Sequence, residues 1–429
     1  MKFAPELYHL SNGIPVILDP MDMETTYVQV YFNTGARDEK RYEYGISHFC
    51  EHLLCKGTPT HPSSKAIVDY LSWHGGWRNA ATSMDAIKLY GRILGDNLTV
   101  LTDVFADCLQ NSLFDPACIE KERAVVLDEL RNSTTDVNQK YLSFISKELF
   151  DNKAYSIRLL GTKKTINSFT RDQLLDFMAR RFSAKNCIIG ISGKIPDKDA
   201  VLRSLEKGFS FLPQTDVSNN TKVYFIPNVA HYSTDGCGYV LLRILFPRIW
   251  YNKPGQVRNW AAFTKFKTYL NEQIRDAVRE RNGLVYQFKG VSVGPDEREL
   301  TGFHTDTSAK NAARVVRIIA QQAADIYNNN PFTDDDMMRL RNKDWLNRAE
   351  FLESSKDRCQ LLVWHYARYG TLYNFEEVTR ALDEVTREDV IRASRGFFVW
   401  PAAIVSYGDD FQEDLGAVWN DNFKVKAWH

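Results

Sequence analysis

The pentapeptide from His48 to His52 has residue types and a spacing that suit metal-dependent hydrolysis. In a helix, residues four apart project from one face, so His48 and His52 can direct their imidazoles at one zinc ion. Glu51 lies beside His52 and can hold a carboxylate near a zinc-bound water without being a ligand. Zinc lowers the pKa of such a water to about 7, and the carboxylate can take its proton as it attacks a carbonyl. The H-x-x-E-H spacing therefore predicts a zinc site with Glu51 as the general base.

A polar patch on the surface of a helix is the alternative interpretation of these residues. The positions around them are nevertheless apolar, so we expect this helix to be buried; the apolar neighbours are Ile46, Phe49, Cys50, Leu53 and Leu54. Buried polar side chains need partners, which favours the metal site over the surface patch.

A catalytic zinc site needs a third protein ligand and an open position. The helix predicted from Pro116 supplies several carboxylates, each of which taken alone could be a solvated charge. Glu122 and Glu129 are seven residues apart and share a face with Val126, whereas Asp128 points about 100° away from Glu129. Glu129 is therefore the better ligand candidate. Glu122, two turns earlier, could hold a ligand imidazole by its second nitrogen.

The segment from Gly45 to Thr58 resembles the signature of the pitrilysin/insulinase family of zinc metallopeptidases. Upstream, Gly35 to Glu39 resembles the Gly-Ser-Arg-x-Glu loop of that family. Downstream, Glu122 to Glu129 resembles the helix that carries the third ligand, at the expected distance from the histidines. The resemblance implies one zinc ion per chain, with Glu129 as the third ligand and Glu122 as the supporting carboxylate.

Two further motifs extend the resemblance to substrate contacts. Asn79 and Ala80 begin an Asn-Ala-Ala-Thr segment similar to the strand that, in the family, pairs with substrate backbone by β-addition. Arg279 to Tyr286 is similar to the family's R-x-x-x-G-L-x-Y motif, which implies that both residues bind the substrate carbonyl and stabilise its developing charge. From the residues alone, Asn79 is equally a turn residue. Gly283 is equally a helix-terminating glycine with Arg279 at the helix end, and Tyr286 is equally a core residue.

One helix–strand unit occurs twice in the chain. The segments Thr170-Arg171-Asp172 and Thr386-Arg387-Glu388 each begin a predicted helix with a hydroxyl cap and an early acid. Each helix is followed by a short apolar strand that ends in glycine, at Gly193 and Gly408. The two threonines are 386 − 170 = 216 residues apart, which is about half of the 429-residue chain. The spacing indicates a duplicated α/β domain.

The duplication predicts two homologous domains. Residues 1–212 would form the zinc-binding domain, residues 213–221 a polar linker, and residues 222–429 the domain with the Arg-Tyr motif. The alternation of strands and helices favours α/β or α+β sandwiches. The resemblance implies that each domain is a mainly antiparallel sheet covered by helices. It also implies a clamshell of two chains around a closed chamber, in which Arg279 and Tyr286 would serve the zinc site of the partner chain.

Apolar periodicity also predicts individual elements. We expect an extended segment at Trp77–Tyr90 and helices at Gly45–Leu54, Ser64–Trp73, Asn97–Gln110, Pro116–Arg131 and Ala349–Tyr369.

Composition bounds the class of protein. Lys plus Arg and Asp plus Glu are each 54, so the net charge is zero, which disfavours a broad sequence-independent hold on nucleic acid. No apolar run approaches the roughly 18–20 residues of a membrane-spanning helix, and the N-terminal segment lacks the apolar stretch of a secretory signal. The seven scattered cysteines include no CxxC pair. We therefore expect no disulfide framework and a cytoplasmic location.

Together these features predict a zinc-dependent endopeptidase that cleaves peptides or unfolded segments inside an enclosed chamber. We expect a homodimer, with a heterodimer with a related subunit as the alternative, and neither a nucleic-acid partner nor a membrane span. Two other functions stay open, namely one subunit of an obligate heterodimeric peptide-processing protease and a non-catalytic scaffold subunit of the same fold. The full ligand set and Glu51 argue against the scaffold.

Overall fold

The computed structural model describes residues 2–151, 159–217, 224–234, 236–247, 255–293 and 300–425. The chain forms two compact units, each of which combines segments from distant parts of the sequence. The first unit contains Met1–Val137, Ile157–Lys222 and Arg348–Tyr373, and the second contains Asn138–Ser156, Val223–Asn347 and Asn374–His429. The predicted linker at 213–221 lies partly outside the described residues.

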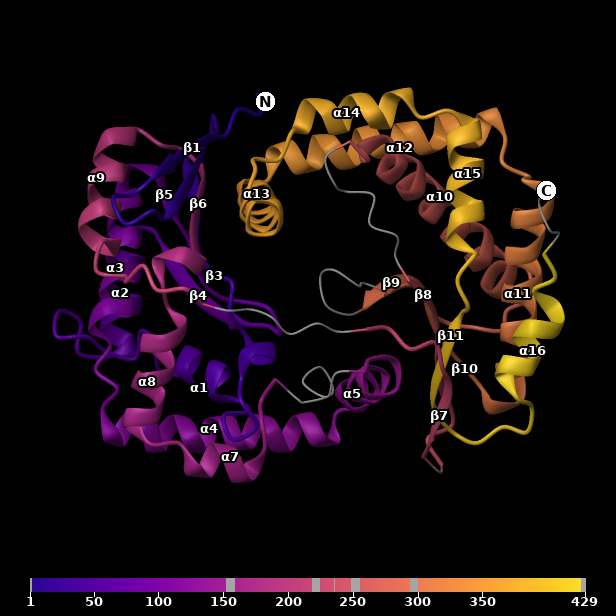
Figure 1. The fold of residues 1–429 in the computed structure, drawn as a ribbon, viewed down its shortest axis with the longest axis horizontal. Coiled ribbons are helices and arrows are strands. Elements are labelled where there is room, and N and C mark those ends of the chain that lie inside the picture. The colour runs from indigo at the N-terminus through magenta and orange to yellow at the C-terminus, as the bar shows by residue number, and fades with distance from the viewer. Residues whose placement is uncertain are drawn as a thin grey trace. The chain divides into compact units, whose positions relative to one another are not determined.

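A six-stranded sheet forms the base of the first unit, in the order β1–β2–β6–β3–β5–β4 (Figure 1). Among the described strands of this sheet, β2 and β6 are the one parallel pair, and the other neighbouring pairs are antiparallel. The strands are β1 (Glu6–His9), β2 (Pro15–Pro20), β3 (Thr25–Phe32), β4 (Trp77–Thr82), β5 (Ile87–Leu94) and β6 (Cys187–Gly193). Strand β4 lies at one edge, so one side of its backbone is open to pairing.

Helices cover one face of this sheet and share its main core. They are α1 (Ile46–Leu53), α2 (Ser64–Trp73), α3 (Leu98–Asn111), α4 (Pro116–Thr135), α7 (Lys163–Ser168), α8 (Arg171–Arg181) and α9 (Lys198–Phe209). Alternation along β5 points Leu89 and Ile93 into this core, where they join Phe49 of α1 and Leu101 of α3.

Helix α13 (Ser355–Tyr369) packs against the opposite face of the same sheet, although it comes from the second half of the sequence. Figure 1 shows α13 on one side of the sheet and α3 and α9 on the other. Leu362 and Val363 contact the apolar residues of β2, β3 and β6 on this face. Arg358 of α13 is fully buried and its Nε donates to Oδ2 of Asp19 in β2 at 2.7 Å. This ion pair fixes the helix on the sheet.

The second unit repeats the arrangement of the first. Its sheet has the order β7–β11–β8–β10–β9, and again a single parallel pair, β7 with β11, adjoins antiparallel strands. The strands are β7 (Val229–Ser233), β8 (Val240–Pro247), β9 (Phe288–Val293), β10 (Leu300–Thr307) and β11 (Ala403–Gly408). The order corresponds to β2–β6–β3–β5–β4 of the first unit.

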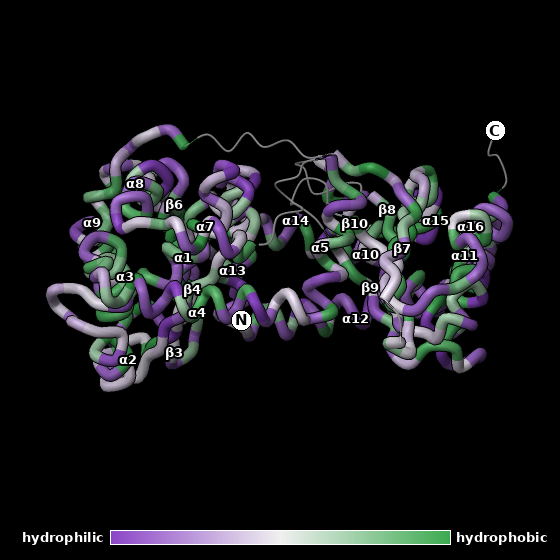
Figure 2. The backbone as a smooth tube through the Cα atoms, turned by 90° about the horizontal axis from the view of Figure 1, so that it is seen from below, coloured by the Kyte–Doolittle hydropathy of each residue, from purple (hydrophilic) through white to green (hydrophobic). Residues whose placement is uncertain are grey.

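The helices of the second unit are α10 (Val257–Arg275), α11 (Ala312–Asn329), most of α12 (Asp334–Glu353), α14 (Phe375–Glu384), α15 (Arg387–Phe397) and α16 (Leu415–Asn422). Along α11, green and purple alternate in Figure 2, as an amphipathic helix requires. Nearly all of α5 (Val137–Leu149) also belongs to this unit. Tyr141 of α5 donates its hydroxyl to the carbonyl of Val405 in β11 at 2.6 Å. Each unit thus receives one helix from the other half of the sequence.

The duplicated helix–strand unit is confirmed. Thr170 and Thr386 each cap a helix, α8 and α15, by accepting a backbone N–H from three residues onward. The strands that follow, β6 and β11, occupy equivalent places in the two sheets. The predicted fold class, two homologous α/β domains with mainly antiparallel sheets covered by helices, is confirmed.

Two expectations are wrong. The single helix predicted over Ala349–Tyr369 is two helices, because Ser354 takes an extended conformation and its side chain caps α13 by accepting the N–H of Asp357. The expectation of no disulfide framework does not hold for Cys55 and Cys108, because a disulfide joins Cys55, just after α1, to Cys108 of α3. Cys50 is buried in the core, as expected for an apolar neighbour of the two histidines on a buried helix.

Candidate metal centre

Helix α1 is fixed at its first turn by a buried carboxylate. Glu39 accepts the backbone N–H groups of Gly45 at 2.7 Å and Ser47 at 2.9 Å, which satisfies donors that a helix start leaves free. Burial raises the pKa of Glu39 to about 8, although the two N–H groups act in the opposite direction. Gly45 has a φ of 93°, which favours glycine at this position. These contacts set the direction of the helix that carries the metal motif.

His48, His52 and Glu129 converge on one point. Each offers one ligand atom, and these three atoms lie within 4.8 Å of one another. The Nε2 atoms of His48 and His52 are 3.7 Å and 3.6 Å from Oε2 of Glu129. Ligand atoms around a zinc ion at bonds of about 2.0–2.1 Å are separated by about 3.4 Å, so both histidine–glutamate distances are close to those of a zinc ligand set.

The state of His48 also suits a metal ligand. Burial and the neighbouring His52 lower the pKa of His48 to about 3, so its ring is neutral and has a free lone pair at neutral pH. The buried Nδ1 of His48 has no hydrogen-bond partner in the described part of the chain. Two imidazoles with one carboxylate form a donor set that zinc prefers.

Glu122 supports His52 from behind. Its Oε2 lies 3.2 Å from Nδ1 of His52, and its Oε1 lies 2.7 Å from Nζ of Lys56. Burial alone would raise the pKa of Glu122, but the hydrogen bonds with Lys56 and His52 outweigh burial and lower it. The carboxylate therefore stays ionised and orients the Nε2 of His52 toward Glu129.

Glu51 lies next to the three candidate ligands but is not one of them. Its Oε2 accepts a hydrogen bond of 3.0 Å from the hydroxyl of Thr82, the last residue of β4. Burial raises the pKa of Glu51, and the neighbouring His52 and the Thr82 hydroxyl offset part of that rise. A carboxylate held in this way beside a metal suits proton transfer with a water at the same place.

Strand β4 connects the carboxylate to the open edge of the sheet. Asn79 is exposed and its Oδ1 accepts the N–H of Ala80, while the methyl group of Ala80 packs against the core. Among the described strands, both residues pair with β5 alone, so the outer edge of β4 can accept an additional strand. Their role in binding substrate stays a prediction.

Arg279 and Tyr286 lie in the second unit, whereas the metal ligands lie in the first. Arg279 is on the π-helical turn Asp276–Glu280 that continues α10, and Tyr286 is 77% exposed in the loop before β9. Gly283 has a φ of 59° and ends this helix by donating its N–H to the carbonyl of Arg279. The exposure of Tyr286 excludes its alternative interpretation as a core residue. The catalytic roles of Arg279 and Tyr286 stay predictions.

Three supporting residues had no assigned role in the sequence analysis, namely Thr82, Lys56 and Glu39. The signal for Thr82 was strand alternation, which places it on the same side of β4 as Ala80. Glu39 precedes α1 and Lys56 follows it. Neither residue is part of this helix, so no helical spacing relates them to the ligands.

Comparison with known proteins gives the family. Residues 16–163 match the family described as insulinase (peptidase family M16), and residues 168–343 match the peptidase M16 inactive domain. The chain belongs to the pitrilysin/insulinase family. In this M16 chain, the candidate metal centre lies in the first unit. The match to the inactive domain begins at residue 168, just before α8.

The relatives of this M16 chain include zinc proteases and a processing peptidase subunit. It is 23% identical over 412 residues to an uncharacterized zinc protease of Rickettsia felis, covering 95% of this chain and 99% of the relative. It is 30% identical over 230 residues to the mitochondrial-processing peptidase subunit beta of Dictyostelium discoideum, covering 53% and 49% of the two chains. A Pseudomonas fluorescens structure, named for the peptidase M16 inactive domain, aligns with a TM-score of 0.82 at 18% identity and covers 96% of this chain and 99% of that one. The structural likeness supports the fold.

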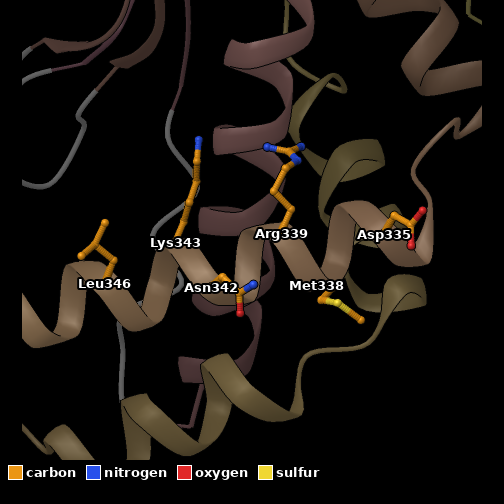
Figure 3. Close-up of a pocket in the computed structure, with 6 residues that line it drawn as sticks. All are labelled: Asp335, Met338, Arg339, Asn342, Lys343 and Leu346. Carbon is orange, nitrogen blue, oxygen red and sulfur yellow. The ribbon is translucent and has the colours of Figure 1, made fainter.

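A surface depression on α12 belongs to the second unit and includes no residue of the metal centre. Figure 3 shows Arg339 and Lys343 on one side of this helix and Met338 on another. Arg339 and Lys343 both form ion pairs with Glu272 of α10, so their charges are already compensated. None of the described helices is both long enough and apolar enough to span a membrane.

Proposed function

We propose that this M16 chain is a zinc-dependent endopeptidase acting on peptides or unfolded segments. The observation that carries the proposal is the convergence of His48, His52 and Glu129 within 4.8 Å, with Glu51 held beside them by Thr82 of an open edge strand. A metal triad, a positioned base and an edge for backbone pairing are the parts that peptide hydrolysis needs.

Each residue then has one task. His48, His52 and Glu129 would hold Zn²⁺, which supplies Lewis acidity at this site when bound. Glu122 orients the ring of His52 and Lys56 orients Glu122. Glu51 takes a proton from the attacking water and can later give it to the leaving amine. Asn79 and Ala80 align an extended substrate along β4, and Arg279 and Tyr286 would bind the scissile carbonyl oxygen.

Zinc removal and return test the metal requirement. The protein freed of metal by a chelator should cleave no peptide, and adding zinc to one equivalent should restore cleavage. Cleavage in H₂¹⁸O should place one ¹⁸O atom in the new carboxyl end, because hydrolysis adds water to the acyl carbon. Cleavage that persists without zinc would overturn the proposal, and a His48→Ala chain serves as the control for metal bound elsewhere.

We propose a homodimer in which Arg279 and Tyr286 complete the site of the partner. Mixed dimers of Glu51→Gln and Arg279→Ala chains should regain part of the activity that each variant lacks alone. Mixed dimers without such rescue would contradict completion by the partner. The relative named as a subunit of a processing peptidase supports one alternative, a heterodimer with a related chain. The mass of the active species in solution separates the two assemblies.

A further inference from the structure

An aromatic row crosses the face of the first sheet that α13 leaves partly uncovered. Tyr27 of β3 is buried and stacks with Tyr90 of β5 at a ring distance of 6.2 Å. Tyr90 in turn meets Trp77 edge-to-face at 6.3 Å. Tyr27 belongs to the cluster under α13, whereas Trp77, at the sheet edge, is 48% exposed. The row thus runs from a packed core to an open aromatic surface.

This surface adjoins the edge that receives the substrate under the proposed function. Side chains alternate along β4, so Trp77 and Asn79 lie on one face, and Arg78 and Thr82 lie on the other. A strand added to β4 places its directly opposite residue with a Cβ about 5 Å from that of Trp77. The substrate side chain at that register therefore contacts the indole.

The spacing along the strand fixes which substrate residue this is. Thr82 contacts the base Glu51, so the scissile bond lies near the Thr82 end of β4. Trp77 is five residues earlier, which corresponds to about 17 Å of extended chain. The residue opposite Trp77 is therefore about five positions from the scissile bond.

The charge of Arg92, on the same face of the sheet as Trp77, determines which class of substrate side chain can bind there. Arg92 of β5 pairs directly with Trp77 across the strands and so projects from the same face. Its buried Nε has no hydrogen-bond partner in the described part of the chain, so its charge is not fully satisfied. A cationic substrate side chain over the indole would meet this guanidinium and be repelled, whereas an aromatic or large apolar side chain gains contact with the ring.

We infer that Trp77 and Tyr90 form a specificity subsite for an aromatic or large apolar substrate side chain about five residues from the scissile bond. The inference rests on the proposed function for the position of the substrate strand. Trp77, which is exposed and takes no part in the chemistry, would then recognise a substrate side chain away from the metal centre. A long substrate gains this contact, and a short one that ends before Trp77 does not.

A residue scan tests the subsite. In one peptide that the protein cleaves, residues three to seven positions from the scissile bond, on each side, are replaced singly by Phe, Ala or Lys. The affinity of each peptide for the Glu51→Gln chain is measured by fluorescence anisotropy, and kcat/KM is measured with the wild type. At one position about five residues from the scissile bond, the peptide with Phe should bind most tightly, the peptide with Ala less tightly and the peptide with Lys most weakly. The affinities of the Phe and Lys peptides should differ at least fivefold.

Variants locate the effect at Trp77. Trp77→Ala should abolish the difference in affinity between the Phe, Ala and Lys peptides, and Trp77→Phe should keep most of it. Trp400→Ala is the control, because it removes an exposed tryptophan of the second unit, and it should leave the three affinities unchanged. A melting temperature close to that of the wild type shows that Trp77→Ala is folded. A flat scan, or an unchanged ranking in folded Trp77→Ala, would overturn the subsite. Ranked binding to Glu51→Gln, together with wild-type cleavage that persists after zinc removal, would instead overturn the proposed function.

Discussion

The hydroxyl of Thr82 donates a 3.0 Å hydrogen bond to Oε2 of Glu51, so the last residue of the edge strand holds the carboxylate of the metal helix. Replacing Thr82 by Val keeps the side-chain shape and removes the donor. A hydrogen bond to a charged group contributes about 1.5 kcal/mol, so kcat should fall about tenfold, with zinc content unchanged. Thr82→Ser, which keeps the hydroxyl, should retain most of the rate. Equal rates for Thr82→Val and the wild type would show that this bond does not position Glu51.

Lys56 should matter for zinc binding although it does not reach the ligands. Its Nζ is 2.7 Å from Glu122, which orients His52. Lys56→Met leaves one oxygen of Glu122 without this partner, and loss of such supporting contacts weakens metal binding about 10–100-fold. Competition with a chromogenic chelator measures the zinc dissociation constant. Lys121→Met, at an exposed position of α4, is the matched control and should bind zinc like the wild type.

The helix exchanged between the halves should depend on its buried ion pair. Arg358 and Asp19 are both fully buried, so Arg358→Met leaves an unpaired carboxylate inside the protein. Removing one partner of a buried pair costs about 3–5 kcal/mol of unfolding free energy. Lys65→Met, which breaks an exposed pair with Asp69, should cost less than about 1 kcal/mol. Urea unfolding followed by circular dichroism compares the two, and equal losses would contradict the role of Arg358.

Stability should also vary with pH through His304. Burial and the nearby Arg243 lower the pKa of His304 from its ordinary value of 6.5 to about 4. The unfolded chain therefore binds more protons than the folded chain between about pH 4 and 6.5, so this residue makes stability fall as the pH falls through that range. In His304→Gln the fall should be shallower. The unfolding free energy is measured against pH for the metal-free wild type and metal-free His304→Gln. Because both proteins contain the histidines of the metal centre, the difference between their pH slopes reports His304 alone. Identical slopes would contradict this role of His304.

The metal centre could be predicted from the sequence because helical spacing determines it. The i, i+4 histidines lie on one face of α1, and the seven-residue spacing on α4 chose Glu129 and Glu122 over Asp128. Asp128 instead pairs with Arg131 at the surface. The capped helices α8 and α15 likewise revealed the duplication from local signals.

Contacts between distant segments could not be predicted in this way. Arg358 and Asp19 are 339 residues apart, and no local period relates α13 to β2. The helix divides at Ser354, which takes an extended conformation and caps α13 with its side chain, and apolar periodicity does not reveal such a cap inside a predicted helix. The Cys55–Cys108 disulfide depends on the approach of the α1 end to α3, which spacing in the sequence does not encode.

The central claim is that Glu51 serves as the base of a zinc site that hydrolyses peptides. The most direct measurement compares zinc content and peptide cleavage for the wild type and Glu51→Gln, purified in parallel. Gln keeps the size of the side chain and cannot accept the proton. We predict one zinc per chain in both proteins, with peptide cleavage at least a thousandfold slower in Glu51→Gln. Cleavage by zinc-loaded Glu51→Gln at the wild-type rate would contradict the account.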